Sequence, residues 1–524
     1  MDKAVEIARQ FKNSPVTIVG DYDADGVTST SILYLAFKWA GFTDVRYRIP
    51  KRFSEGYGIS RSIIDEIRDG LLITCDNGIA QLDAIKLAKE KGLKIIILDH
   101  HLPAVIDGKD VLPDADAVID PNALAGTADF SGYCGAGLSY KFARMLLDGN
   151  KTQCRKLLNF AAIGTVADVM ELRQENYVFV REGLKSLVRS DYCTAGLYAL
   201  ISAFSLTSHI SSYDIGYKLG PAINAASRMK DDGAMIAVRL LTYEGDYSSA
   251  VQMAEELVCL NESRKAEKSA GLKAAHEAIE RDCLFGDIPM VVYVQGVGEG
   301  IIGILAGNLC EEFKVPVIVL TDASEGILKG SGRSYGNYDM KAQLDLCSSL
   351  LITHGGHVGA AGLSLRKENV ELFRSQLMSN ASDYEASSES DTYYDLEIKA
   401  TEIPSFIEQI SRFEPFGEGN PSIVFKINGF SVVPRYGSFK KLMGADESIV
   451  KLFSSSCTAI GFDMAERMRG IDEPKILDMV GVLSDNYFNG SVEHQIEFTD
   501  FKEAATAKVE TPLASMLRSM AMSR

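Results

Sequence analysis

Acidic and imidazole side chains directly follow three predicted strands. These strands span residues 16–20, 71–75 and 94–98 and are rich in aliphatic and β-branched side chains. The side chains that follow them are Asp21, Asp23 and Asp25 in GDYDADG, Asp76 in TCDNG, and Asp99, His100 and His101 in DHH. Because ligands bind at the carboxyl ends of the strands in an open parallel sheet, we expect these groups to gather at one edge.

So many carboxylates can share one site only where cations compensate their charge. Uncompensated like charges would raise one another's pKa and force protonation. Carboxylates suit hard cations, and the imidazoles shift the preference toward Mn²⁺ over Ca²⁺. Two such ions would activate a water molecule and hold a phosphoryl group. Asp168, in GTVADVMEL after a helical stretch, is a further candidate for the same edge.

Each motif taken singly also has a structural interpretation. Asp and Gly favour turns and helix caps, which would explain DADG, CDNG or VADV one at a time. Such groups at three successive strand ends are much harder to explain in this way. The P-loop, HExxH and GxSxG patterns do not occur, and the GxG of CGAGLSY lacks a third glycine. We interpret that GxG as packing of a helix on the sheet.

The elements around these motifs predict an α/β fold. Helical patterns over 27–40 and 81–92 alternate with the strands, and a short strand follows at 117–119, which indicates βαβ units and a parallel sheet. Further predicted elements are helices at 135–147 and 156–166, a long bridging helix at 253–280, a second α/β unit from Met290 to about Leu365, an acidic segment at 380–397, and a β-rich region to about Phe501.

Composition excludes several classes of protein. The 524 residues include 54 basic and 71 acidic side chains, a net charge of −17, which argues against a histone-like nucleic-acid binder but not against one local basic groove. With 46% hydrophobic residues, general disorder is excluded. The N-terminus has no secretory signal pattern, and no apolar run reaches the ~20 residues of a membrane span. Nine cysteines without CxxC spacing favour reduced thiols and a cytoplasmic location.

In this order, GDYDADGVTST, TCDNG, DHH and GTVADV resemble the four motifs of the DHH phosphoesterases. Other segments narrow the resemblance to the RecJ-type single-strand exonucleases. These segments are IPKRFSEGYG, GPAINAASRM, LNESRK, GSGRS, HGGHVGAAG and FEPFGEGNPSIVF, at 49–58, 220–229, 260–265, 330–334, 354–362 and 413–425. The match runs over about residues 15–500, and chain length resembles the archaeal RecJ-like, GINS-associated nucleases most.

The resemblance implies a parallel-sheet DHH domain, a long connecting helix, a smaller α/β DHHA1 domain and a C-terminal β-rich domain like the oligonucleotide-binding (OB) fold. It divides the chain into a DHH catalytic domain, a helical connector, a DHHA1 substrate-binding domain, an acidic linker, an OB-like nucleic-acid or partner-binding domain and a tail. The implied boundaries are 1–195, 196–285, 286–378, 379–398, 399–505 and 506–524.

The resemblance also implies roles for the site residues. The implied ligands of two Mn²⁺ or Mg²⁺ ions are Asp23, Asp25, Asp76, His100 and Asp168. Asp76 would lie between the ions, and Asp99 would orient a ligand imidazole from outside the ligand set. His101 would face the scissile phosphate and stabilise its charge or protonate the leaving oxygen. For Asp21, ligation and orientation of the first motif both stay open.

DHHA1 would hold the nucleic acid, since glycine backbone N–H groups can approach phosphate and an arginine can bind it bidentately. The implied substrate-binding residues are Arg52, Asn224, Arg228, Ser331, Gly332, Arg333, Ser334, His354, Gly355, Gly356 and His357. Without the resemblance, GSGRS and HGGH are turn sequences, and no carboxylate or cysteine cluster near HGGH in sequence supports a metal pair. We expect the three arginines to form a local basic cleft in an acidic exterior.

The sequence is therefore interpreted as a two-metal phosphodiesterase that removes nucleotides from one end of single-stranded DNA or RNA, in repair or replication. Two alternatives stay open. One is a superfamily member with a small substrate, such as an oligoribonuclease, a cyclic-dinucleotide phosphodiesterase or a pyrophosphatase, against which the extra C-terminal domain argues. The other is a GINS-associated replication factor, although all five implied ligands are present. Polarity and the choice between DNA and RNA stay open.

Overall fold

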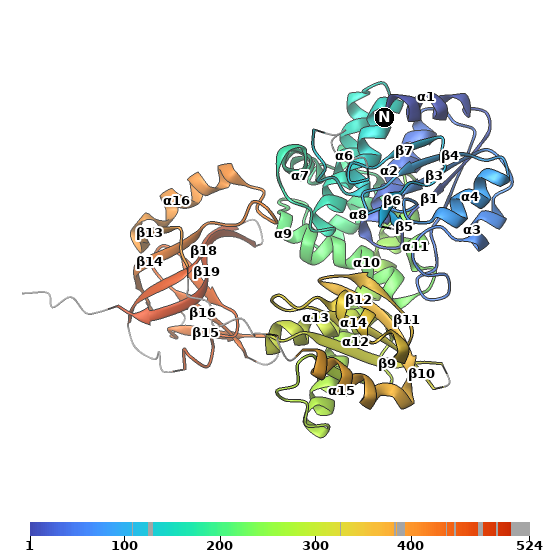
Figure 1. Ribbon diagram of the computed structural model, residues 1–524. Helices are drawn as coiled ribbons and strands as arrows, with labels where there is room; N and C mark the ends of the chain where they lie inside the picture. Colours follow the sequence, from blue (N-terminus) through green and yellow to red (C-terminus); the bar gives the residue numbers. More distant parts are fainter. Residues whose placement is uncertain are drawn as a thin grey trace, which may run out of the picture. The chain divides into compact units, whose positions relative to one another are not determined.

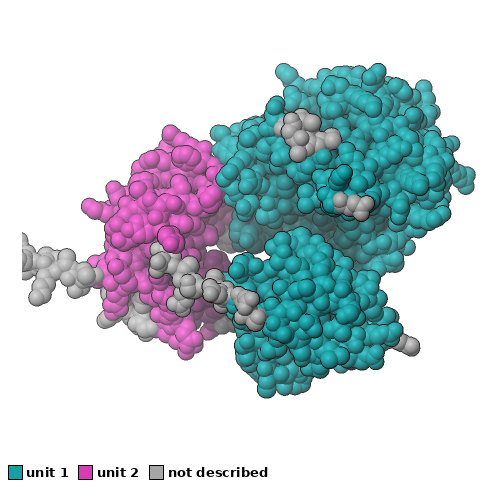
Figure 2. All heavy atoms as spheres, viewed as in Figure 1, with its two compact units in different colours: residues 1–388, 417–419 teal, residues 389–416, 420–524 magenta. Residues whose placement is uncertain are grey.

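The computed structural model describes residues 1–504 except 107, 124–128, 325, 382–383, 385–392, 436, 445–446, 470–474 and 489–490. The chain forms two compact units, residues 1–388 with 417–419 and residues 389–416 with 420–524 (Figure 2). Half of the predicted acidic linker and the whole predicted tail lie outside the described residues. Among the described helices, none is long and apolar enough to cross a membrane.

The first unit begins with a five-stranded parallel sheet (Figure 1). Its order is β2 (Asp44–Arg48), β1 (Pro15–Val19), β3 (Leu71–Cys75), β4 (Lys94–Leu98) and β7 (Ala117–Ile119). The register keeps the carboxyl ends of the strands level, because Val19 pairs with Thr74, Cys75 with Leu98 and Leu98 with Ile119. Residues that follow these strands therefore share one edge.

Alternating side chains of this sheet enter two separate cores, which is how a doubly wound sheet is buried on both faces. Ile18, Ile73 and Ile96 pack in the core on one face of the sheet, called the first core here. Leu72 and Ile97 pack in the second core, on the other face. The first core includes α1 (Asp2–Gln10), α2 (Ala24–Trp39), α5 (Gly135–Leu146) and α6 (Lys151–Ala167), and the second includes α3 (Arg61–Glu66) and α4 (Leu82–Glu90).

A helical region follows the sheet. It contains α7 (Gln174–Leu187), the short helix η1 (Ser190–Tyr192), α8 (Ala195–Ala203), α9 (Ser212–Asp214), the π-helical segment η2 (Ile215–Leu219), α10 (Gly220–Met229), α11 (Gly233–Leu241) and α12 (Tyr247–Arg281). The elements α9, η2 and α10 follow one another without a break. Helix α12 has 35 residues, about 50 Å at 1.5 Å per residue, and leads to the second sheet.

The second sheet has the order β11-β12-β10-β9-β8, in which only β8 and β9 pair in parallel. Its elements are β8 (Met290–Tyr293), α13 (Glu299–Phe313), β9 (Val317–Ser324), β10 (Ile327–Arg333), α14 (Met340–Leu346), η3 (Ser348–Leu350), β11 (Leu351–His357), β12 (Ala360–Arg366), η4 (Lys367–Asn369) and α15 (Val370–Asn380). Two cores line its faces, one with α12 and α13 and the other with α14 and α15.

The second unit is built on a seven-stranded sheet of order β13-β14-β18-β19-β17-β16-β15. Its elements are β13 (Leu396–Lys399), η5 (Ala400–Glu402), α16 (Ile403–Ile410), η6 (Ser411–Phe413), β14 (Val424–Ser431), β15 (Lys440–Met443), β16 (Ile449–Phe453), β17 (Thr458–Gly461), β18 (Ile476–Phe488) and β19 (Ser491–Glu503). Its own core combines side chains of α16 and of the strands, such as Ile407, Phe425 and Ile496.

The predicted fold class is confirmed in all its parts: a parallel-sheet domain, a long connecting helix, a smaller α/β part and a β-rich C-terminal unit. Two features were not predicted. Strand β2 reads DVRYR, and its charged residues hide an edge strand from a search for apolar runs. The hairpin of β5 (Ala104–Ile106) and β6 (Lys109–Val111) is only three residues long on each side.

Candidate metal centre

The carboxyl edge of the first sheet carries an acid after each of four strands. Asp76, Asp99 and Asp120 come directly after β3, β4 and β7, and Asp21 comes two residues after β1. All four side chains are buried. Asp76 adopts a left-handed backbone conformation with φ of 62°, which Asp tolerates better than most residues. The strand before Asp120 was predicted from the sequence at 117–119, but the acid that follows it was not singled out.

His100 lies at the centre of the predicted ligand set. Its Nε2 atom is 3.1 Å from Asp76 Oδ1, 3.7 Å from Asp168 Oδ2 and 3.9 Å from Asp25 Oδ2. These groups come from β3, β4, α2 and the end of α6, where Asp168 is the C-terminal capping residue. The sequence prediction that separate elements bring these side chains together is thus matched by the geometry of this edge.

Backbone N–H groups fix the first motif in place. Asp23 begins α2 as its N-cap and accepts a hydrogen bond from Gly26 N at 3.0 Å. Both oxygens of Asp25 accept from the first turn of α5, Oδ2 from Gly135 N at 2.6 Å and Oδ1 from Ala136 N at 2.9 Å. The GxG of CGAGLSY therefore has a second role besides helix packing, since it supplies backbone donors to an acid of the site.

Asp99 contacts a different ring from the one expected. The Oδ1 atom of Asp99 lies 2.8 Å from the ring atom Nδ1 of His101. With His100, the same oxygen contacts only the backbone N, also at 2.8 Å. Ile79 N donates to the other oxygen at 2.9 Å. The expectation that Asp99 orients a ligand imidazole is therefore corrected: the side chain it holds is His101. After β4 ends at Leu98, the His100 ring lies 3.1 Å from Asp76 and the His101 ring 2.8 Å from Asp99.

Tyr57 is a neighbour of the site that sequence reasoning did not single out. Its hydroxyl donates to the backbone oxygen of Asp76 at 3.2 Å and lies 3.1 Å from Nδ1 of His101. It belongs to the IPKRFSEGYG segment, which had been noted only for its resemblance. A tyrosine in a glycine-rich loop does not by itself indicate a role at the site. Its position becomes clear only when the structure shows the loop beside the strand ends.

The acids of this edge compete for their charges. Burial and the neighbouring Asp25 raise the pKa of Asp76 well above its ordinary value, and burial and Asp23 do the same for Asp21. Burial, Asp25 and Asp23 raise the pKa of Asp168 to about 8. These shifts are what uncompensated carboxylates produce when they are held together in a buried place.

The imidazoles differ in the same environment. Burial lowers the pKa of His100, which suits a neutral ring that offers a lone pair. Burial also acts to lower the pKa of His101, but the hydrogen bond and charge of Asp99 raise it to about 9. Burial opposes ionisation of Asp99 too, and the bond from His101 nevertheless holds the pKa of Asp99 below its ordinary value. His101 and Asp99 therefore form an ion pair at neutral pH.

The donor set fits one or more divalent cations. Three groups have ligand atoms within 4.8 Å of one another: Asp25 with His100 and Asp168, Asp21 with Asp23 and Asp76, and Asp76 with His100 and His101. Asp21 Oδ1 is buried and has no hydrogen-bond partner among the described residues, so a cation would satisfy it. Carboxylate and imidazole ligands of this kind suit Mn²⁺ or Mg²⁺. The geometry supports ligation for Asp21, which the sequence had left open.

Four arginines lie close to this edge in the same unit. Burial lowers the pKa of Arg228 to about 9, and the charges of Arg52, Arg264 and Arg333 act in the same direction. Arg228 Nη1 donates to Gly300 O at 3.0 Å, and Arg52 lies 4.4 Å above the ring of Tyr22. Arg52, Arg228 and Arg333 thus lie near one another, and Arg264 of LNESRK lies with them.

The other implied substrate residues lie on two elements. Asn224 of α10 accepts from Ala24 N through its Oδ1 at 2.8 Å, so it caps the helix that carries Asp25. Ser331, Gly332 and Arg333 end β10, where Arg333 Nη1 donates to Ser331 Oγ at 3.2 Å.

Strand β12 separates β10 from β11, which carries His354, Gly355, Gly356 and His357. Ser334 follows β10 and donates to Val358 O at 2.6 Å. His354 pairs with Asp345 at 2.9 Å, so this motif has a carboxylate beside it that sequence distance concealed.

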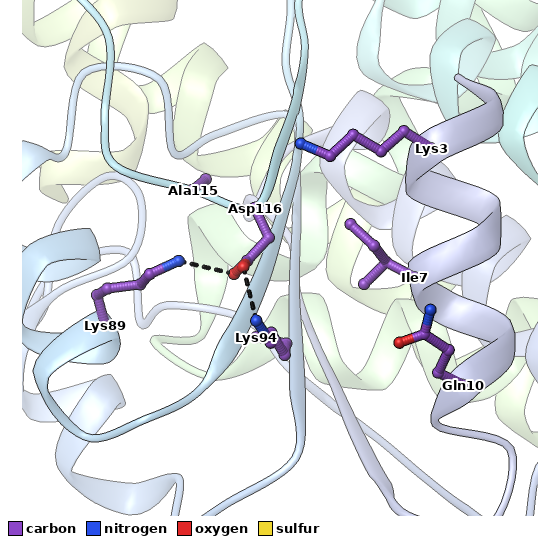
Figure 3. A pocket seen from close by; sticks show the side chains of 7 residues that line it. All are labelled: Lys3, Ile7, Gln10, Lys89, Lys94, Ala115 and Asp116. Carbon is purple, nitrogen blue, oxygen red and sulfur yellow. Dashed lines mark hydrogen bonds and ion pairs between the residues drawn. The ribbon is translucent and has the colours of Figure 1, made fainter.

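The opposite edge of the first sheet has a cavity of about 410 Å³. Its lining includes Lys3, Lys89 and Lys94 around Asp116 (Figure 3). Lys94 is the first residue of β4, and both Lys89 and Lys94 pair with Asp116 at 3.0 Å. This cavity lies at the amino ends of the strands, so it is separate from the acids and histidines described above.

Three protein-family models match the chain. They are the DHH family N-terminal domain at residues 15–165, the DHHA1 domain at 287–382 and the RecJ OB domain at 394–500. The single-stranded-DNA-specific exonuclease RecJ of Dickeya dadantii is 33% identical over 453 residues, which cover 81% of this chain and 77% of that protein. The RecJ of Haemophilus influenzae is 36% identical over 383 residues, 68% of this chain and 64% of that protein.

Solved structures agree with the sequence comparisons. The crystal structure of RecJ in complex with Mn²⁺ from Thermus thermophilus matches with a TM-score of 0.77 and 25% identity, and covers 96% of this chain and 72% of that one. A structure of exonuclease RecJ bound to manganese matches with a TM-score of 0.62 and 28% identity, over 74% of this chain and 94% of that one. The chain therefore belongs to the RecJ-type single-strand exonucleases of the DHH phosphoesterase family.

Proposed function

We propose that this chain is a metal-dependent exonuclease that removes nucleotides from one end of single-stranded nucleic acid. One observation carries this proposal: a largely buried group of acids and histidines adjoins a group of half-buried arginines in the same unit. The acids fit divalent cations, and the arginines fit a phosphate. The named relatives are single-stranded-DNA-specific exonucleases, which favours DNA as the substrate of this chain.

We propose Asp23, Asp25, Asp76, His100 and Asp168 as metal ligands, with Asp21 added to the set. Bound divalent cations supply a nucleophile at neutral pH and positive charge for the phosphoryl oxygens. The backbone donors of Gly135 and Ala136 hold Asp25 so that its remaining lone pairs face the site. Ile79 and the turn after β4 hold Asp99, which in turn fixes the ring of His101.

His101 is the residue we assign to the leaving oxygen. Its side chain is 43% exposed, much more than that of His100 at 12%, so it can meet a substrate that enters from solvent. The hydrogen bond and charge of Asp99 raise the pKa of His101 and so favour a proton on the ring. That proton can stabilise charge on a phosphoryl oxygen or pass to the departing oxygen.

We propose the arginine group as the place that holds a phosphate of the strand. Arg228 is half-buried near three like charges, and it donates to the backbone oxygen of Gly300. A phosphate between these guanidinium groups would offset their repulsion and accept bidentate hydrogen bonds. Ser331, Gly332, Ser334 and the HGGH residues of β11 remain proposed contacts farther along the strand.

The division of the chain into domains supports a long substrate. We propose the DHH, connector, DHHA1 and OB-like parts as the working units, at the boundaries given above. The small-substrate alternative gains no support from the OB unit, which is a separate compact body with its own core. A dinucleotide substrate would leave that unit without a role.

The experiment that tests this function compares Asp76→Asn with Asp83→Asn. Asp83 is an exposed acid of α4, so its substitution is a matched change of charge away from the site. End-labelled single strands of DNA and of RNA, each with Mn²⁺, would report the activity, the sugar preference and the polarity together. We expect Asp76→Asn to lose hydrolysis by at least ~10³-fold while Asp83→Asn stays active. Normal activity of a folded Asp76→Asn protein would refute the assignment.

We also propose a GINS partner and a cytoplasmic location. A GINS partner rests on the resemblance to archaeal RecJ-like proteins, and co-purification of the chain with GINS would test it. A cytoplasmic location is supported by the nine cysteines, all of which are free thiols in the structure. Fractionation of cells that express the tagged chain would test that location.

A further inference from the structure

Two exposed tyrosines are stacked on each other near the metal centre. The ring centroids of Tyr213 and Tyr217 lie 4.3 Å apart with an angle of 24° between the ring planes. Tyr213 is 59% exposed and Tyr217 is 68% exposed. Both rings are accessible to solvent and offer flat apolar faces on which another flat group can stack.

The element that carries these rings packs on the end of α6. Tyr213 is in α9 and Tyr217 in the π-helical segment η2. A Cβ atom built on Gly216 would lie 3.8 Å from Val166 Cγ1, and one built on Gly220 would lie 3.1 Å from Ala167 Cβ. The next residue of the chain after Ala167 is Asp168, a proposed metal ligand. The helical segment that carries the tyrosine pair therefore packs, through its glycines, on the segment that supplies this ligand.

The elements α9, η2 and α10 form one continuous helical segment. Their sequence therefore sets the order in which the tyrosine pair, Asn224 and Arg228 follow one another along this segment. Asn224, seven residues after Tyr217, bonds Ala24 N between Asp23 and Asp25. Arg228 of the arginine group follows four residues later. Measured along the helix axis at 1.5 Å per residue, Tyr217 comes about 10 Å before Asn224 and Arg228 about 6 Å after it. The segment of α9, η2 and α10 thus runs beside the metal centre. It carries Arg228 of the proposed phosphate site toward its C-terminal end and the stacked tyrosines toward its N-terminal end.

We propose that Tyr217, backed by Tyr213, is a stacking platform for a base of the single strand on the side of the metal centre opposite to the arginine group. This inference rests on the proposed function. A strand with its terminal phosphate at the arginines and its scissile phosphate at the metal centre continues toward Tyr217. Bases of any sequence can stack on an aromatic face, which suits an exonuclease that must accept every nucleotide.

The proposal predicts an effect that depends on substrate length. Single strands of about 12 nucleotides reach the tyrosine pair, whereas a dinucleotide does not. We expect Tyr217→Ala to raise KM for the long strand by at least about fivefold, with kcat nearly unchanged, because stacking on one ring contributes to binding of the whole strand. The dinucleotide should be hydrolysed at the same kcat/KM by both proteins. Tyr213→Ala should act in the same direction with a smaller effect.

Conservative variants separate stacking from structure. Tyr217→Phe and Tyr217→Trp keep an aromatic face and should keep the low KM, whereas Tyr217→Leu should behave like Tyr217→Ala. Tyr247→Ala is the matched control, since Tyr247 is another exposed tyrosine of the same unit, whose ring lies beside Tyr198 on α8. We expect its KM to equal that of the native chain on both substrates.

Fluorescence gives a readout without turnover. With Ca²⁺ in place of Mn²⁺, a strand that carries 2-aminopurine at one of its first ~5 positions should show quenching at one position that is lost in Tyr217→Ala and kept in Tyr217→Phe. An active enzyme in which Tyr217→Ala leaves the long-strand KM and the quenching unchanged would overturn the platform. A native chain that hydrolyses neither substrate would instead overturn the proposed function.

Discussion

At the scale of single residues, spacing was a good guide to which acids meet. The positions of Asp76 and His100 directly after strands predict their convergence, and their side chains lie 3.1 Å apart. The role of Asp21 could not be read in the same way. Whether a carboxylate oxygen lacks a donor depends on the surrounding backbone, and only the structure shows that Asp21 Oδ1 is buried without a partner among the described residues.

Asp21→Asn tests whether that oxygen is a ligand. The change keeps the shape of the side chain and removes one charge from the group with Asp23 and Asp76. We expect the affinity for Mn²⁺, measured by calorimetry, to fall by about 10- to 100-fold. Asp83→Asn is the control and should bind Mn²⁺ as the native chain does. If Asp21 only orients the first motif through its backbone, the affinity of Asp21→Asn would also be unchanged.

At the scale of elements, the close contact of α5 with the acids is the feature that sequence could not give. The sequence does not distinguish the two glycines of CGAGLSY, Gly135 and Gly137, but their surroundings in the structure differ. A Cβ on Gly135 would lie 2.6 Å from Asp76 Cβ and 2.9 Å from Asp25 Oδ2, whereas one on Gly137 would have its nearest contact at 3.4 Å, with Tyr133. Only the first glycine is required by the site.

Gly135→Ala and Gly137→Ala therefore form a matched pair in one helix. Both substitutions favour the helical backbone by up to ~1 kcal/mol, so propensity does not distinguish them. We expect Gly135→Ala to displace Asp25 and Asp76 and to lower the affinity for Mn²⁺ and the kcat by at least about tenfold each. Gly137→Ala should keep both within about twofold. Equal kinetics of the two variants would show that α5 has room to move away from the acids.

The carboxyl edge of the first sheet predicts how pH and metal together determine stability. Burial and neighbouring acids raise the pKa of Asp168 to about 8, and those of Asp21 and Asp76 are also raised. Without metal, the folded chain thus keeps protons that the unfolded chain has already released above about pH 5. Because the unfolded state binds fewer protons there, the free energy of unfolding falls as pH rises toward 8.

We expect the melting temperature in EDTA to decrease from about pH 6 to about pH 8. Saturating Mg²⁺ should raise it, by a larger amount at the higher pH, since the ligands must be deprotonated before they bind. In Asp168→Asn, the decrease in EDTA should be smaller because one of the raised groups is gone. A gain from Mg²⁺ that is the same at both pH values would contradict this account.

At the scale of the whole molecule, the fold could be predicted better than the surface. Strand and helix periods predict the parallel sheet, the long α12 and the β-rich unit, because the apolar pattern of each element records which face is buried. Net charge does not record where charges lie. The value of −17 includes acids grouped at the carboxyl edge, while Arg52, Arg228, Arg264 and Arg333 are gathered beside them.

This distribution predicts the salt dependence of strand binding. Four arginines that neutralise phosphates of a single strand give a slope of log KM against log salt of about 3 in magnitude, at constant Mg²⁺. Arg333→Gln should lower that slope by about 0.7, the share of one contact. Lys3→Gln is the control, because Lys3 lines the cavity at the opposite edge of the first sheet (Figure 3) and its loss changes net charge by the same amount. An equal change of slope in both variants would mean that the strand responds to the electrostatic field of the whole chain and not to the arginine group. The acidic exterior would then govern binding, as the net charge alone suggests.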